Sequence, residues 1–274
     1  MNSPDSRVAA RAAASAQAAI AANDSFKYWR FCLACGPIFL LAYFGFWGLL
    51  GYCVPPLPAM MTAQEMAAHF QANAAQMRLG MVGAMTFAPT YMIWGLGITK
   101  VMETFEGNNK ILSTLQLWGA GLTVIPVLMC CVFILAGSYR ADTIDPSIVQ
   151  LMYDMSWLTI SVCYSVTTMQ MIAMGVIFLG DKRMKPLVPK WLCWYSIWGG
   201  FMFIGEDLMP FFKEGVFARN GLVNFWIEYS IYFFYMIFVT GYLFKAVTRL
   251  ETEARAGIPP LEAAQGRTGL LSHA

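Results

Sequence analysis

Charged side chains are scarce in this chain. Only 12% of its 274 residues are Asp, Glu, Lys or Arg, whereas a soluble globular protein carries about 25%. The 18 basic and 16 acidic residues leave a net charge of +2, which is too small to indicate binding to nucleic acid. The remaining charges gather at the ends of long apolar runs. This pattern is typical of a helical membrane protein that crosses the bilayer several times.

Histidine is almost missing as well. The sequence has two, His69 and His273, and neither lies inside an apolar run. This argues against a histidine-ligated haem, copper or di-iron site and against a serine–histidine dyad within the membrane. The sequence also has no Walker P-loop, no dinucleotide-binding G-x-G-x-x-G and no H-E-x-x-H. We therefore predict no cofactor, no metal site and no identifiable catalytic residues.

Apolar residues, in contrast, make up 58% of the chain. They form six long runs, each reaching the ~20 residues needed to cross a ~30 Å hydrocarbon core. The predicted membrane-spanning helices cover residues 31–53, 78–99, 112–137, 150–180, 190–212 and 222–247. The seven cysteines lie almost all within these runs, and we interpret them as small packing residues. The predicted fold class is an all-α membrane protein, a six-helix transmembrane bundle.

The loop after the first span carries the signal for one more helix. Three prolines at positions 55, 56 and 58 end the first span, and Thr62 with Glu65 three residues later forms a capping-box pattern. This predicts a short extracytoplasmic helix over residues 63–77 that runs directly into the second span.

The distribution of Lys and Arg predicts the orientation. Of the 18, only Arg78, Arg140, Lys213 and Arg219 fall on the side away from the termini. Positive charges favour the cytoplasmic side, so both termini are predicted to be cytoplasmic. We expect a cytoplasmic Ala-rich tail at 1–28, a transmembrane domain at 29–248 and a cytoplasmic C-terminal tail at 249–274.

Four carboxylates lie inside the apolar spans, where an ionisable group costs roughly 2.5 to 3.5 kcal/mol. They are Asp154, Glu206, Asp207 and Glu228. A rise of about 1.5 Å per residue puts all of them in one shallow layer near the outer face. Further polar residues follow helical spacing along the fourth span (Trp157, Ser161, Ser165, Thr168) and the sixth (Asn224, Tyr232, Tyr235, Tyr242). These polar faces should turn inward, away from lipid.

Two interpretations of these acids stay open. In one, spans 4, 5 and 6 enclose an outward-opening acidic cavity, with Tyr232 in its floor. In the other, the acids form ion pairs with the basic residues of the same face and hold the bundle together. The candidate ligand-binding residues are the four acids together with Tyr232, Arg78, Arg140 and Arg219.

Three segments resemble a family of six-span bacterial integral membrane proteins that has no assigned activity. They are Leu151-Met152-Tyr153-Asp154 followed by Trp157, Pro189-Lys190-Trp191, and the stretch from Phe211 to Gly221. The likeness covers about residues 30–248. Members often read Gly-Pro-Phe-Ala-Trp where this chain reads Gly215-Val216-Phe217-Ala218-Arg219, so this chain has an extra positive charge beside its acids. The resemblance implies a bacterial inner membrane and carries over no catalytic residues.

The first hypothesis for function is therefore binding or transport of a small molecule or cation at the acidic outer cavity. The alternative is a non-catalytic scaffold or accessory subunit whose acids are interhelical ion pairs. A membrane enzyme that uses paired carboxylates is a third, less favoured hypothesis. The expected partners are the lipid bilayer and a small ligand, and the sequence does not indicate an oligomeric partner.

Overall fold

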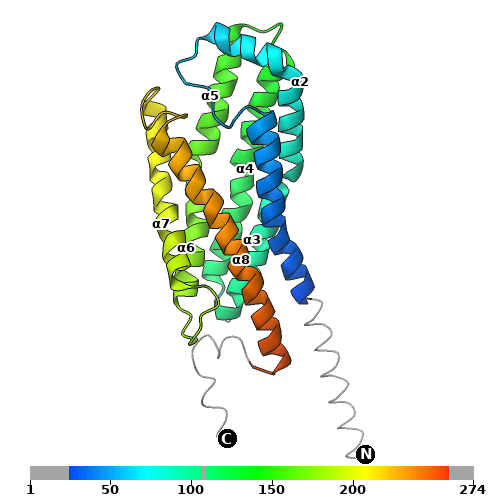
Figure 1. The fold of residues 1–274 in the computed structure, drawn as a ribbon, viewed down its shortest axis with the longest axis vertical. Helices are drawn as coiled ribbons and strands as arrows, with labels where there is room; N and C mark the ends of the chain where they lie inside the picture. The colour runs from blue at the N-terminus through cyan, green and yellow to red at the C-terminus, as the bar shows by residue number, and fades with distance from the viewer. Residues whose placement is uncertain (1–24, 107–108, 259–274) are drawn as a thin grey trace, which may run out of the picture.

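The structure of the chain is a computed structural model that describes residues 25–106 and 109–258. Most of the predicted N-terminal tail and the end of the C-terminal tail, including His273, lie outside the described residues. The described part is helical and contains no strand. The helices lie side by side along the long axis of the molecule, and the described chain begins and ends at the same end of the bundle (Figure 1). The predicted all-α bundle is confirmed.

Six helical segments run along the bundle, and most of them are interrupted. The first helix, Ser25–Leu50, ends in the π-helical stretch η1 (Phe44–Leu50). The others, in chain order, are α2 (Ala63–Phe87) with α3 (Pro89–Glu106), α4 (Ile111–Tyr139), α5 (Pro146–Val162) with α6 (Ser165–Leu179), α7 (Lys190–Met202) with the 3-10 helix η2 (Phe203–Phe211), and the π-helical η3 (Leu222–Ile227) with α8 (Glu228–Arg255).

Five of the six segments are long and apolar enough to cross a membrane. The exception is the fifth, because α7 ends at Met202 and a 3-10 helix takes over. The second segment starts at Ala63, where the helix preceding the second span was predicted to start, and it continues past the predicted end at residue 99 to Glu106. Its capping box is present as predicted: the Thr62 hydroxyl accepts from the Glu65 amide, and the Glu65 carboxylate accepts from the Thr62 amide at 2.8 Å.

The ends of two other helices follow directly from local sequence. Asp145 caps α5 by accepting a hydrogen bond from the Ser147 amide at 2.8 Å, with Pro146 at the first helical position. The hydrogen bonds from Ser147 also lower the pKa of Asp145, which lies in the loop between α4 and α5. At Pro89 the chain passes from α2 to α3, since proline has no amide hydrogen to continue the helix. Pro126, in contrast, is accommodated inside α4.

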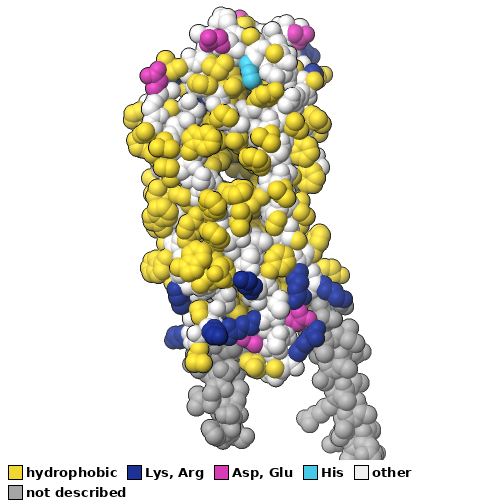
Figure 2. Space-filling model, in the orientation of Figure 1, with side chains coloured by type: hydrophobic (Ala, Val, Ile, Leu, Met, Phe, Trp, Pro, Cys, Tyr) yellow, Lys and Arg dark blue, Asp and Glu magenta, His cyan; other side chains and the backbone are white. Residues whose placement is uncertain are grey.

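The distribution of side chains over the surface is that of a membrane protein. Figure 2 shows a broad band of apolar side chains around the middle of the visible face. Lys and Arg gather at the end of the bundle where the described chain begins and ends (Figure 2). A bilayer matches such a surface, because the apolar band meets lipid tails and the basic end meets a charged interface.

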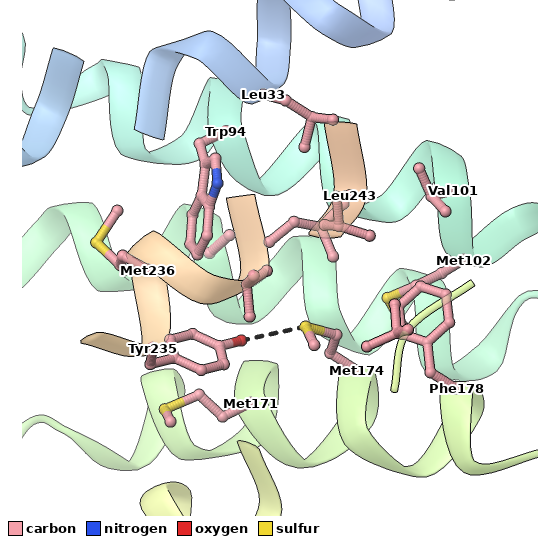
Figure 3. Packing of buried hydrophobic residues seen from close by; sticks show 14 of the residues in the cluster. Leu33, Trp94, Val101, Met102, Met171, Met174, Phe178, Tyr235, Met236 and Leu243 are labelled. Carbon is pink, nitrogen blue, oxygen red and sulfur yellow. Dashed lines mark hydrogen bonds between the residues drawn. The ribbon is translucent and has the colours of Figure 1, made fainter. Parts of the chain in front are cut away.

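The interior has two buried hydrophobic clusters, one above the other. The cluster nearer the chain ends contains Trp94, Met174 and Tyr235, and the Tyr235 hydroxyl points to the Met174 sulfur at 3.4 Å (Figure 3). The other cluster contains Trp47 and Trp157 and packs against the loop of residues 51–62, which contributes Cys53 to it. The polar residues of interest lie where these two clusters meet.

Candidate functional site

Asp154 forms the one predicted acid–base pair that the structure contains. The guanidinium of Arg219 lies 2.5 Å from the Asp154 carboxylate and also donates to the carbonyls of Leu57 and Pro58. The same guanidinium lies over the ring of Tyr153, 4.7 Å from its centroid. Arg219 is only 4% exposed, whereas the Asp154 side chain is 44% exposed. This arrangement connects the loop of residues 51–62 to α5 and to the segment before η3. We call it the Asp154–Arg219 clasp, because it holds these three parts of the chain together.

The other predicted basic partners lie apart from the acids. Arg78 donates to the carbonyl of Ala74 on its own helix at 3.0 Å, and Arg140 lies beside the ring of Tyr139. Within residues 25–106 and 109–258, neither arginine forms an ion pair with a carboxylate of the outer layer. The prediction that all four acids could be neutralised by nearby arginines is therefore met only at Asp154.

Glu206 and Glu228 come together instead of pairing with cations. Glu206 in η2 is 3% exposed and Glu228 at the start of α8 is 1% exposed. The two carboxyl groups are close enough to interact directly. A Cβ atom on Gly205 would collide with Oε1 of Glu228, which places that carboxyl group against the backbone of η2. Asp207, the next residue, is exposed and accepts a hydrogen bond from the Tyr164 hydroxyl at 2.8 Å.

Several buried polar atoms around this pair have no hydrogen-bond partner among the described residues. They are both oxygens of Glu228, the amide oxygen and nitrogen of Asn224, the Ser161 hydroxyl and the indole nitrogen of Trp157. Leaving one such group unsatisfied costs about 1 to 3 kcal/mol. Native proteins keep few of them, and a group of them at one place indicates a position that takes up water, an ion or a ligand.

A cavity of about 390 Å³ opens beside the carboxyl pair. Glu206 is the only one of the four acids that lines it; most of its wall is apolar or aromatic, and Tyr164, Tyr229, Tyr232 and Thr167 add hydroxyl groups. The Tyr232 hydroxyl donates to that of Tyr91, another lining residue. Figure 2 shows a hollow in the apolar band, at the position where the first helix and α8 face the viewer in Figure 1. The cavity therefore opens sideways, toward the region that lipid tails would occupy.

This geometry corrects the predicted cavity in two respects. Spans 4, 5 and 6 do not enclose it alone: the first helix contributes Tyr43 and Trp47, α3 contributes Tyr91 and α4 contributes Thr123. The cavity is also mainly apolar, because Asp154 is occupied by Arg219 and Asp207 is directed to Tyr164. Of the polar stripes predicted along the fourth and sixth spans, only Tyr232 lines the cavity, and no pattern in the sequence pointed to Tyr43 and Trp47 of the first span.

The backbone around the cavity departs from α-helical geometry at four places. Lining residues come from η1 (Trp47), the break between α5 and α6 (Cys163 and Tyr164), η2 (Glu206) and η3 (Phe225). Non-helical backbone at membrane depth is tolerated where it is buried or lines a cavity, and π and 3-10 turns often occur at functional sites. All four interruptions therefore fall where the backbone lines the cavity, which is where a membrane protein tolerates them.

Among the described residues, no three His, Cys, Asp or Glu side chains are grouped so that they could hold a metal ion. The arrangement offers one carboxyl pair, several phenol groups and a large apolar wall. It can therefore bind a ligand with a small polar head and an apolar body.

Comparison with known proteins gives no further indication: the chain matches no protein-family model, no curated protein and no solved structure.

Proposed function

We propose that this polytopic membrane protein binds a small, mainly apolar molecule in the lateral cavity, with Glu206 as its main polar contact. The observation that carries the proposal is the cavity itself. Its volume falls in the range of about 300 to 1,000 Å³ that is usual for small-molecule sites, and it combines an apolar wall with few polar groups. The hollow in the apolar band gives such a ligand a route from the bilayer.

We further propose that the membrane is a bacterial inner membrane and that the basic end of the bundle is cytoplasmic. The concentration of Lys and Arg at that end supports this orientation. The cavity would then lie in the outer half of the bilayer. Whether binding leads to transport is a separate step, and a transporter would have to open the cavity to the cytoplasmic side as well.

The alternative, a scaffold or accessory subunit, is supported by the Asp154–Arg219 clasp. Interhelical hydrogen bonds such as Trp94 to Thr240 at 2.9 Å also serve mainly to hold helices together. A scaffold has no need for an accessible cavity with unpartnered polar atoms beside it. Occupancy of the cavity therefore distinguishes the two functions.

Cys163 provides a direct test of that occupancy. It is the one cysteine of the seven that is exposed, and it lines the cavity. We expect N-ethylmaleimide to label it faster than the other cysteines, and phenylbutanol, an apolar molecule with one polar group, to slow this labelling. Cys163→Ser shows which part of the label belongs to this thiol.

A matched pair of variants locates the binding. Ser230→Trp places a large side chain at the cavity wall, whereas Gly241→Trp places it on the same helix where nothing lies within 4 Å of an added Cβ atom. Protection of Cys163 should disappear in the first variant and remain in the second. If neither phenylbutanol nor the corresponding amine and carboxylic acid protects Cys163, the binding proposal is wrong and the scaffold is favoured.

A further inference from the structure

We propose that the polar head of the ligand is a cationic amine, so that the site takes a membrane-soluble organic cation held by Glu206, with Glu228 beside Glu206 adding negative charge. This inference rests on the proposed binding function and adds the chemical class of the ligand. It is carried by the carboxyl pair and by its position at the wall of an apolar cavity.

The carboxyl pair lacks a counter-charge. Within the described residues neither Glu206 nor Glu228 takes part in an ion pair, and no residue other than Glu206 is placed to donate to the oxygens of Glu228. Two carboxyl groups in contact in a medium of low dielectric constant cannot both be ionised unless a cation lies nearby, and otherwise they share a proton. A ligand cation at Glu206 would supply the missing positive charge.

Aromatic rings surround the same point. Tyr43 stacks on Trp47 at a centroid distance of 4.9 Å, and Trp47 stacks on Tyr229 at 6.2 Å. All three line the cavity together with Glu206. In this stack the rings cover one another's faces, so they give the cavity a rigid apolar wall beside Glu206 that suits the apolar body of the ligand.

The neighbouring clasp shows how this protein holds a cation in the same layer. There the Arg219 guanidinium lies between the Asp154 carboxylate and the Tyr153 ring. The carboxyl pair repeats the carboxylate of this arrangement without an arginine. At the clasp the Arg219 side chain occupies the space next to Asp154, whereas the space next to Glu206 is the cavity.

Other head groups fit less well. An anionic head would meet a carboxyl pair with no cation to offset the repulsion. A bare metal ion would require more ligands than the described residues bring together. A neutral alcohol could bind through hydrogen bonds, and this is the competing possibility that the experiment addresses.

The experiment compares three probes with the same apolar body: phenylbutylamine, phenylbutanol and phenylbutanoic acid. Their binding to the full chain in detergent micelles is measured by calorimetry and by protection of Cys163. We expect the amine to bind at least about tenfold more tightly than the alcohol, a difference of about 1.4 kcal/mol, and the acid to bind most weakly.

Substitutions then assign the preference to the carboxyl pair. Glu206→Gln should remove most of the advantage of the amine while leaving the alcohol unchanged, and the retained alcohol binding shows that the variant is folded. Asp142→Asn removes an exposed charge of the outer loop and should change neither affinity. If the alcohol and amine bind equally to the native chain, or if Glu206→Gln weakens both to the same extent, the amine assignment is overturned while the cavity remains a binding site. If none of the probes binds, the proposed function itself fails.

Discussion

At the residue scale, the four membrane carboxylates separate into three different situations. Asp154 is paired with Arg219, Asp207 accepts a hydrogen bond from Tyr164 and faces outward, and Glu206 and Glu228 share a buried place without a cation. A buried carboxyl pair without a cation is unfavourable for stability, whereas the other two acids have partners that account for their positions. Function is therefore to be sought at the Glu206–Glu228 pair.

Arg219→Gln should destabilise the protein more than Asp154→Asn does. The first change leaves two loop carbonyls and a carboxylate without a donor, and we expect a loss of about 3 kcal/mol in the free energy of unfolding. The second leaves the buried Arg219 charge without its carboxylate but keeps its hydrogen bonds to the two loop carbonyls, and should cost about 2 kcal/mol. Denaturant titration in micelles measures both. The double variant should cost less than the sum of the single ones, and strict additivity would show that the clasp does not exist in solution.

Glu228→Gln should leave the stability of the ligand-free protein unchanged or raise it. The amide has the same shape as the carboxyl group, cannot be charged and brings two hydrogen-bond donors to a place that has unpartnered acceptors. Thermal unfolding in detergent measures the effect, with Arg219→Gln as the reference for a true clasp. A large drop in melting temperature for Glu228→Gln would mean that Glu228 is structural and would weaken the case for a site.

At the element scale, the crossing segments contact one another closely through glycine, while four of them lose α-helical geometry around the cavity. An added Cβ atom on Gly119 of α4 would lie 2.7 Å from the Val166 carbonyl of α6, which is too close for any side chain. Small residues at such contacts let helices approach in a membrane. Close contacts such as that between α4 and α6 hold the bundle together, while the interrupted helices surround the cavity.

Gly119→Ala should therefore destabilise the protein by about 1 to 3 kcal/mol, because α4 and α6 must move apart. Gly241→Ala is the matched control, since nothing lies within 4 Å of its added Cβ atom and alanine favours a helix. We expect this control to be neutral or slightly stabilising. Equal effects of the two substitutions on denaturant unfolding would rule out the close approach at Gly119.

At the scale of the whole molecule, the bundle presents an apolar band with a basic end. The described chain starts and finishes at that end, which requires an even number of crossings. The loop between α6 and α7 lies at the basic end, and the loop between η2 and η3 lies at the opposite end (Figure 1). Two exposed residues, Lys185 and Lys213, mark these loops.

The proposed cytoplasmic position of the basic end in a bacterial inner membrane predicts that a membrane-impermeant maleimide labels Lys213→Cys on intact spheroplasts and labels Lys185→Cys only after the membrane is opened. Both variants carry Cys163→Ser, so that the exposed native thiol does not contribute. The reverse pattern would show that the bundle has the opposite orientation. Labelling of both sites on intact spheroplasts would contradict the six crossings.

Much of the architecture was predictable from local sequence. The apolar runs, the Thr62–Glu65 capping box and the Asp145–Pro146 start of α5 each specify their own structure, because helix length and capping depend on residues within a few positions of each other. The break of the fourth span at Cys163 and the 3-10 turn around Glu206 were not predicted. The sequence around the fourth-span break contains no proline or glycine that would predict it. The 3-10 helix η2 forms where Glu206 contacts Glu228 of α8 and Asp207 contacts Tyr164.

The sequence alone determined that the protein is a helical membrane bundle and that four carboxylates lie within its apolar spans. Only the tertiary structure decided which of those carboxylates has a partner. The reason is distance along the chain: Asp154 and Arg219, or Glu206 and the Tyr43–Trp47 pair, are brought together by helix packing, which no local pattern records. The same packing turned an expected acidic pocket among three helices into an apolar cavity that opens toward the lipid.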